Sequence, residues 1–232
     1  KLIKSALVSI SVGTGFDDVS FKSDFWEFDP VANYWTQKAD FGGGVRYLGT
    51  GFSVGNKGYA GMGIYGYYAW GKDMWEYRPD SNSWRQVADF EGSYRYTAVG
   101  FGIGNKGYMG TGYYREWPWT STIFYNDFWE YDPSVGALGT WTMKSDVPGD
   151  GRYYAVGLSI GNKGYIGTGI DASDTRKKDF WEFDPSAGVL GTWTRKADLS
   201  GEERYAAQGF SIRNKGYVGT GYNFSFLNDV WE

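Results

Sequence analysis

The chain contains no cysteine and no histidine among its 232 residues. Without cysteine it cannot form disulfides, zinc–thiolate sites, iron–sulfur clusters or a thiol nucleophile. Without histidine it lacks the commonest general base, the commonest transition-metal ligand and the usual partner of a serine nucleophile. Most familiar catalytic constellations are therefore excluded for this chain alone, and we expect a protein with no enzymatic activity, no cofactor and no metal site.

Other features are scarce as well. No stretch approaches 18 consecutive apolar residues, so the sequence predicts no transmembrane helix. The net charge is −4 and the basic residues are dispersed, so the basic stripe that nucleic-acid binding needs is missing. The segment 1–10 begins with a basic head and a short apolar run, as a signal-peptide remnant would, although Val12–Gly15 then matches a repeat strand.

What the chain has in abundance is glycine, with 36 residues, and aromatic side chains, at 20%. That combination favours many short strands joined by tight turns. No segment shows a 3.6-residue apolar period, so we expect almost no helix. Five copies of an Asp-x-Trp-Glu phrase recur about every 50 residues, a spacing typical of a propeller blade. Their tryptophans are Trp26, Trp75, Trp129, Trp181 and Trp231.

Each repeat divides into four strand-like pieces. The first follows an Arg-Tyr pair and ends at a turn such as Gly55-Asn-Lys-Gly58, and the second carries paired glycines, as in 108–112. Asparagine and glycine suit the positive φ angles of such hairpins. The third piece is the Asp-x-Trp-Glu phrase, and the fourth contains a second tryptophan. These fourth-piece tryptophans are Trp35, Trp84, Trp141 and Trp193, and we expect both tryptophan sets in the core.

Paired glycines, an aromatic third piece and a tryptophan in the fourth together resemble the kelch repeat, over essentially the whole chain. The resemblance implies β-propeller blades whose first strands line a central channel and whose fourth strands form the rim. The residue pattern of the repeat is similar to that of bacterial secreted or envelope kelch proteins, which are often described as galactose-oxidase-like. The copper-radical site of galactose oxidase needs histidines and a cysteine-linked tyrosine, so that chemistry is excluded here.

We therefore predict an all-β kelch-type β-propeller of about five blades, each a four-stranded antiparallel sheet, in one domain over residues 1–232. The last blade lacks a fourth strand, and residues 1–15 supply a first and a second strand without the Asn-Lys-Gly turn. A five-bladed ring and a stretch of a six- or seven-bladed one both fit. The repeat units are 1–40, 41–90, 91–146, 147–198 and 199–232.

The repeated arginines are the first candidate site. Arg46, Arg95, Arg152 and Arg204 stand at matching positions, where a ring of guanidinium groups at the channel mouth would bind an anion. Each repeat also supplies one glutamate after its tryptophan, so the favoured interpretation is structural ion pairing of arginine with glutamate between blades.

The connections between second and third strands differ most between repeats, and function tends to lie on such variable loops. The segments 113–126 and 64–71 place aromatic rings beside polar groups, as sugar stacking or a protein contact requires. The alternative is that these rings form a cap over the propeller itself. The candidate binding residues are Tyr65, Tyr67, Tyr68, Trp70, Arg115, Trp117, Trp119, Phe124 and Tyr125. In a third connection, the spacing of Asp171 and Asp174 faintly suggests calcium, but a solvated turn is favoured.

Three functions compete on these observations. The first is a non-catalytic binding or scaffold module that presents its loop face to a protein or glycan. The second is a sugar mutarotase or epimerase of the kelch type, which would need an unpaired carboxylate in the channel mouth. The third is a structural subunit of a cell-envelope assembly, in which another chain covers the open blade edge. We favour the first, with the chain located outside the cytoplasm or in the envelope.

Overall fold

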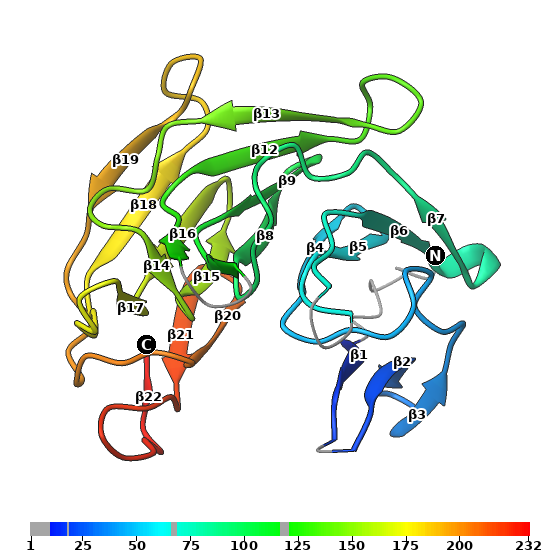
Figure 1. Cartoon of the computed structure of the whole chain (residues 1–232), viewed down its shortest axis with the longest axis horizontal. Coiled ribbons are helices and arrows are strands. Elements are labelled where there is room, and N and C mark those ends of the chain that lie inside the picture. Colours follow the sequence, from blue (N-terminus) through cyan, green and yellow to red (C-terminus); the bar gives the residue numbers. More distant parts are fainter. Residues whose placement is uncertain (1–9, 18, 66–68, 117–120) are drawn as a thin grey trace, which may run out of the picture.

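The computed structural model describes residues 10–17, 19–65, 69–116 and 121–232. These form five antiparallel sheets arranged as the blades of a β-propeller, along an arc with the first and last blades at its two ends (Figure 1). The only helical element described is one 3-10 turn, Pro79–Ser81. The predictions of an all-β fold and of five blades are confirmed.

The second, third and fourth blades each contain four strands, whereas three strands are described in the first and in the last. Blade one comprises β1 (Ile10–Phe16), β2 (Phe21–Asp29) and β3 (Tyr34–Gln37). Blade two comprises β4 (Thr50–Val54), β5 (Lys57–Gly61), β6 (Met74–Arg78) and β7 (Ser83–Gln86). Blade three comprises β8 (Val99–Ile103), β9 (Lys106–Gly110), β12 (Phe128–Asp132) and β13 (Thr140–Lys144). Blade four comprises β15 (Val156–Ile160), β16 (Lys163–Gly167), β18 (Phe180–Asp184) and β19 (Thr192–Arg195). Blade five comprises β20 (Gln208–Ile212), β21 (Lys215–Gly219) and β22 (Val230–Trp231).

Two small ribbons lie outside the blades: β10 (Tyr113–Glu116) with β11 (Ser121–Phe124), and β14 (Arg152–Tyr153) with β17 (Ile170–Asp171). The segment 113–126, expected as a loop, thus contains a β-hairpin. Its flanks alternate aromatic, β-branched and polar residues, which favours paired strands over an irregular connection.

The turn between first and second strands repeats in the same conformation. Its first residue has a positive φ of 61° at Gly55, 58° at Gly104 and 59° at Gly161, where glycine costs nothing sterically. Blade five places Arg213 there, with φ 57°. Glycine at the head of the turn, rather than asparagine, therefore supplies the left-handed residue of this hairpin.

In each of blades two to five, a buried arginine forms hydrogen bonds that connect the segments flanking the inner, second and third strands. The Arg46 guanidinium donates to the two carboxylate oxygens of Asp73 at 3.0 and 2.8 Å and to the carbonyl of Met62. The indole Nε1 of Trp75 donates to the same carboxylate at 2.7 Å. The other three arginines repeat the arrangement, each with an aspartate of its own blade. The pairs are Arg95 with Asp127, Arg152 with Asp179 and Arg204 with Asp229. The expected partner was wrong, because the arginine binds the aspartate of the Asp-x-Trp-Glu phrase and not its glutamate.

The glutamate of the phrase has a different role. Glu76 accepts from the Tyr59 hydroxyl at 2.9 Å and forms ion pairs with Lys57 and Arg78. Burial alone would raise its pKa, but the hydrogen bonds from Arg78, Tyr59 and Lys57 lower the pKa of Glu76 to about 2. The same tyrosine–glutamate bond recurs in blades three, four and five.

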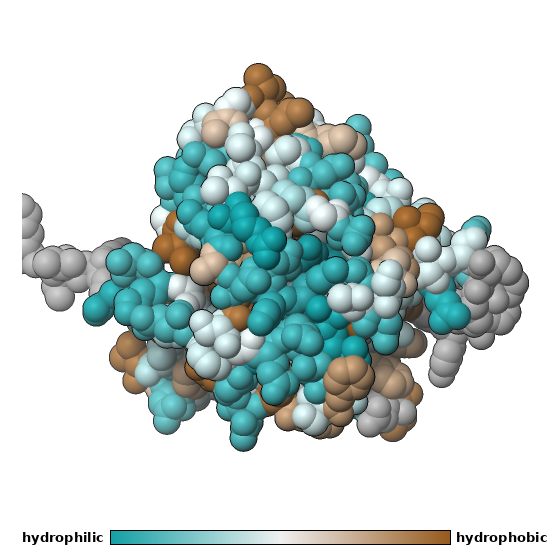
Figure 2. All heavy atoms as spheres, turned by 90° about the vertical axis from the view of Figure 1, so that its left-hand side faces the viewer, coloured by the Kyte–Doolittle hydropathy of each residue, from teal (hydrophilic) through white to brown (hydrophobic). Residues whose placement is uncertain are grey.

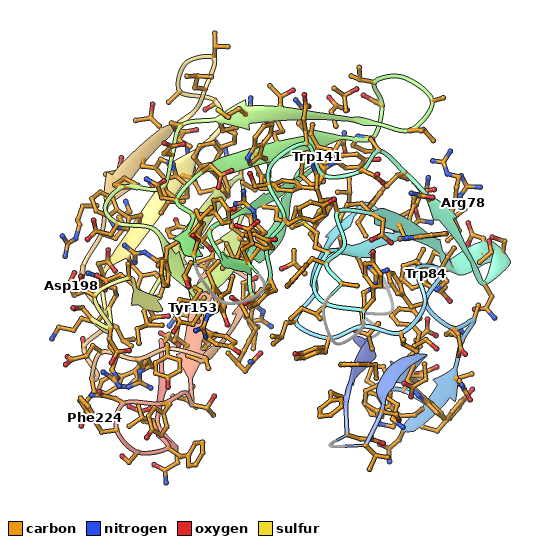
Figure 3. All side chains as sticks on the ribbon, in the orientation of Figure 1. Arg78, Trp84, Trp141, Tyr153, Asp198 and Phe224 are labelled. Atoms are coloured by element: carbon orange, nitrogen blue, oxygen red, sulfur yellow. The ribbon has the colours of Figure 1, made fainter. Side chains whose placement is uncertain are left out.

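The fourth-strand tryptophans connect neighbouring blades. Trp84 and Trp141 donate through Nε1 to the carbonyls of Ala39 and Ala88, in the connections that leave the preceding blades, and they follow one another along the arc (Figure 3). Trp193 does the same to Ser145. Trp141 is buried, as predicted, but Trp35 in blade one and Trp231 in blade five are exposed. The side of the molecule around blade four is mainly hydrophilic across its middle, as a solvated rim should be (Figure 2).

We predict that Arg95→Ala lowers the free energy of unfolding by about 3–5 kcal/mol, because it leaves the Asp127 carboxylate without its buried partner. Arg195→Ala is the control, since Arg195 pairs with Asp198 on the surface and its loss should cost at most about 1 kcal/mol. Urea unfolding of both variants measures the difference. Equal losses would show that the buried pair adds no more than a surface pair.

Stability should also depend on pH in a characteristic way. Burial alone would raise the pKa of Asp73, but hydrogen bonds from Arg46 and Trp75 hold it below the ordinary value, and the bond from Arg204 lowers the pKa of Asp229 to about 2. A lowered carboxyl pKa stabilises the fold above the unfolded value near 4, and this contribution is lost as pH falls below it. With no histidine, no side chain of ordinary pKa titrates between pH 5 and 8. Urea unfolding from pH 8 to 3 should therefore give a flat stability down to about pH 5 and a fall below about pH 4. A slope between pH 8 and 5 would contradict this.

Candidate functional site

A pocket of about 310 Å³ lies where the loops of the second and third blades meet. The connection from β5 to β6 supplies Tyr65, Trp70 and Lys72, and the connection from β7 to β8 supplies Asp89 and Tyr94. Gly43, Arg46, Gly71 and Asp73 complete the lining. The pocket thus lies among the variable connections that the sequence singled out, and it combines three aromatic rings with a lysine, an arginine and two carboxylates.

The two aromatic connections come together beside this pocket. The Trp70 ring meets the Tyr114 ring of β10 edge-on, with centroids 5.3 Å apart, and Tyr94 lies 6.2 Å from Tyr114. Lys72 Nζ lies 5.8 Å from the centre of the Tyr94 ring. Tyr65 and Tyr94 remain 46% and 47% exposed, so their faces are accessible to a ligand.

The predicted binding residues fall into three groups. Tyr65 and Trp70 line the pocket, and Arg115 lies in the exposed second half of β10. Phe124 and Tyr125 point inward instead: Phe124 packs against Tyr113 and Tyr153, and Tyr125 lies against the Arg95 guanidinium. The others, Tyr67, Tyr68, Trp117 and Trp119, lie outside the described residues.

The four arginines proposed as a channel-mouth anion site are all buried, with exposed fractions of 2% or less. Their terminal nitrogens donate to aspartate and to backbone carbonyls within the blade, as described above. Their positive charge is therefore already neutralised by a carboxylate at close range. The favoured interpretation of these arginines as structural agrees with this geometry, although with a different partner.

Asp171 belongs to a closed turn. Its carboxylate accepts from the backbone amides of Ser173 and Thr175 and pairs with Lys177 Nζ at 2.5 Å. Burial alone would raise the pKa of Asp171, but these bonds hold it below the ordinary value. Asp174 has a positive φ of 57°, typical of such a turn. The segment is a turn, as favoured, but Asp171 is buried rather than solvated, and its carboxylate is occupied by two backbone amides and Lys177.

Sequence reasoning missed a cluster of tyrosines. The second members of the four Arg-Tyr pairs, together with Tyr113 and Tyr154, form the tyrosine cluster. The four are Tyr47, Tyr96, Tyr153 and Tyr205. The Tyr113 ring lies 4.1 Å from Tyr96 and 4.3 Å from Tyr153, centroid to centroid. Figure 3 shows Tyr153 toward the inner side of blade four and Asp198 on its outer side. The signal was present, since the tyrosine repeats directly after the arginine.

The tyrosine cluster is built from neutral phenols. Burial raises the pKa of Tyr113, and a hydrogen bond with Tyr96 raises it further. Burial likewise raises the pKa of Tyr154 to about 12. At neutral pH these hydroxyls can donate and accept hydrogen bonds, but they cannot act as phenolate bases.

The sequence analysis did not identify Lys72, Asp89 and Tyr94 as residues of this pocket. Asp89 and Tyr94 lie in the fourth-to-first connection, whereas Lys72 lies in the same connection as Trp70. Only the fold brings these two connections together, so no spacing in the sequence indicated the combination.

The chain is thus a five-bladed β-propeller with a pocket lined by aromatic residues on its loop face. Among solved structures, the chain is similar to that of YjhT, with a TM-score of 0.71 and 18% sequence identity. The match covers 86% of this chain and 66% of the YjhT chain, so this chain spans about two-thirds of the length of that protein. At this identity the likeness shows the fold alone. No protein-family model matches the chain, and no curated protein matches it. In the described part of the chain, no helix is long and apolar enough to cross a membrane.

The tyrosine cluster makes a prediction for alkaline titration. When the folded chain is titrated to pH 11, the change in phenol absorbance should correspond to the ionisation of well under 20 tyrosines, because burial raises the pKa of Tyr113 and Tyr154. In urea, all 20 tyrosines should ionise near pH 10. Tyr154→Phe should leave the folded change below pH 11 nearly unaltered, because Tyr154 ionises near pH 12. Because a raised tyrosine pKa stabilises the fold only below the unfolded value, stability should fall above about pH 10. A loss of one tyrosine's absorbance change below pH 11 in Tyr154→Phe would contradict the buried, neutral cluster.

Proposed function

We propose that the chain is a non-catalytic binding module that captures a glycan in the loop-face pocket. The observation that carries this is the convergence of Tyr65, Trp70 and Tyr94 with Lys72 and Asp89 around one 310 Å³ space. That volume lies at the lower end of the range of small-ligand sites, which suits one or two sugar rings. The apolar C–H face of a sugar stacks on an aromatic ring, while its hydroxyls need nearby donors and acceptors.

The chemistry of the pocket favours binding over catalysis. Of the two carboxylates in the pocket lining, Asp73 is neutralised by Arg46, whereas Asp89 forms no ion pair with the described residues and accepts a hydrogen bond from the Gln86 side chain. Asp89 is therefore the one carboxylate of the described lining that acid–base chemistry could use. The nearby tyrosines stay protonated at neutral pH because burial raises the pKa of Tyr96 and of Tyr125. A mutarotase or epimerase needs a free acid and base at the sugar, whereas a binding module needs exposed rings, and Tyr65 and Tyr94 supply them. A location outside the cytoplasm or in the envelope belongs to the same proposal, because glycans are displayed there.

The first test is a glycan array probed with the chain, followed by calorimetric titration of the best ligand. Trp70→Ala and Tyr94→Ala should each weaken binding at least about tenfold, which corresponds to about 1.4 kcal/mol of lost contact. Tyr34→Ala is the matched control, because Tyr34 is an equally exposed ring on β3, in blade one and outside the pocket lining. Unfolding midpoints of all three variants establish that the loss is local.

Three outcomes would overturn the proposal. Unchanged affinity in Trp70→Ala and Tyr94→Ala would place the glycan elsewhere. A stoichiometric protein partner in an affinity pull-down from the native source, with no glycan bound on the array, would replace the glycan with a protein. Accelerated interconversion of the two anomers of a bound sugar, followed by NMR, would make the chain a mutarotase.

A further inference from the structure

One arginine on the loop face has no carboxylate partner. Arg176 lies in the connection from β16 to β18, and within the described residues no acidic side chain forms an ion pair with it. Its one hydrogen bond there is long, from Nη1 to the backbone carbonyl of Asp174 at 3.4 Å, and its Nε is buried without a partner. In the remaining sequence the only acidic residue is Asp18, whose neighbour Asp17 lies between β1 and β2 in blade one. The described structure therefore leaves the positive charge of Arg176 unneutralised.

Two aromatic rings of blade five lie against this guanidinium. The Cζ atom of Arg176 is 4.0 Å from the centre of the Phe224 ring and 5.7 Å from that of Tyr205. Such cation–π contacts hold an arginine in place, but they use none of its N–H groups. The N–H edge of the guanidinium therefore stays available for an acceptor. A carboxylate complements that edge best, because it can accept two parallel hydrogen bonds.

Phe224 is held in an unfavourable backbone conformation. Its φ is 56°, in the left-handed region that bulky side chains avoid and that glycine or asparagine adopts more easily. Its side chain is nevertheless 78% exposed, on the connection from β21 to β22, which projects from the end of the arc (Figures 1 and 3). A ring outside the core adds little to the stability of its blade. Backbone strain at such a position is typical of residues that contact a ligand.

The shape of this surface favours a protein over a small molecule. Small-molecule sites are concave, and neither of the two described cavities is lined by Arg176 or Phe224. An exposed aromatic ring beside an arginine has instead the composition of the residues that dominate protein–protein contacts. A projecting ring fits a partner that itself supplies the hollow, and the unneutralised charge requires that the partner be acidic.

We propose that Arg176 and Phe224 bind an acidic peptide segment of a protein partner. A carboxylate of the segment, from Asp or Glu, accepts hydrogen bonds from the free N–H groups of Arg176, and a neighbouring apolar side chain packs on the exposed ring of Phe224. The charge pair provides the specificity, and the burial of the ring provides affinity. The surface belongs to blades four and five, so it is independent of the glycan pocket at blades two and three.

An array of acetylated and amidated octapeptides serves as the probe. Each peptide carries one central Asp or Glu, flanked by every combination of Ala, Leu, Val, Phe and Trp, and a matched array carries Asn or Gln instead. The labelled chain should bind a subset of the acidic peptides, and the matched amide peptides should bind at least about tenfold more weakly. No binding to any acidic peptide, or equal binding to its amide counterpart, would overturn the proposal.

The variant Arg176→Gln tests the charge on the protein side. It should weaken binding of the best acidic peptide at least about tenfold, and it should no longer distinguish that peptide from its amide counterpart. Arg213→Gln is the matched control, because Arg213 is an exposed arginine at the opposite end of β21 from Phe224. Equal losses in the two variants would show that the peptides respond only to overall charge, which would contradict a site at Arg176.

The variant Phe224→Asn separates the proposed role from a structural one. Asparagine adopts a positive φ with less strain, so the unfolding midpoint should stay unchanged or rise, while peptide binding should fall at least about tenfold. A lower midpoint with unchanged binding would make Phe224 a cover for Arg176 and would overturn the proposal. Self-association of the unaltered chain that Phe224→Asn abolishes would assign the surface to a second copy instead. Loss of glycan affinity in Arg176→Gln would assign it to the glycan.

Discussion

The arrangement of this propeller depends on one buried interaction that each of blades two to five repeats. An arginine from the connection into the inner strand donates both terminal nitrogens to an aspartate at the start of the third strand, as Arg152 does to Asp179 at 2.6 and 2.9 Å. The following tryptophan donates to the same carboxylate, and the arginine also donates to a carbonyl at the end of the second strand. One guanidinium thus links the connection into the inner strand to both ends of the connection between the second and third strands. The loops that emerge from these connections start from fixed positions, and this is what allows residues distant in sequence to share a pocket.

The repeat made much of the fold predictable. The Asp-x-Trp-Glu motifs, the turn glycines and the second tryptophans recur in register, so the strand order within a blade and about five blades could be predicted from spacing. The same spacing also fitted a stretch of a six- or seven-bladed ring. The partner of the arginines was not predictable in the same way. Aspartate and glutamate occur in every phrase, three residues apart, and on a strand this puts them on opposite faces. Which face meets the arginine depends on the path of the connection, and the structure pairs the arginine with Asp73 while Tyr59 bonds Glu76.

The candidate site was predictable only where the signal was local. Tyr65 and Trp70 belong to one aromatic connection and were found, whereas Tyr94 and Asp89 come from a connection whose sequence is unremarkable by itself. Phe124 and Tyr125 were expected to face a partner but pack against Tyr153 and Arg95, because the segment forms a hairpin that turns one face inward. The composition could exclude cysteine- and histidine-dependent catalysis, but only the folded propeller shows which side chains from different connections share a pocket.

The buried arginines are structural, because the charge of each guanidinium is neutralised by an aspartate of its own blade. The most direct measurement is a double-mutant cycle on Arg152→Met and Asp179→Asn, followed by urea unfolding of the four chains. Because the pair is bidentate and its arginine is buried, we predict a coupling free energy of at least about 2 kcal/mol. A coupling below about 0.5 kcal/mol would contradict the account and would free the four guanidinium groups for the anion-binding role that their repetition first suggested.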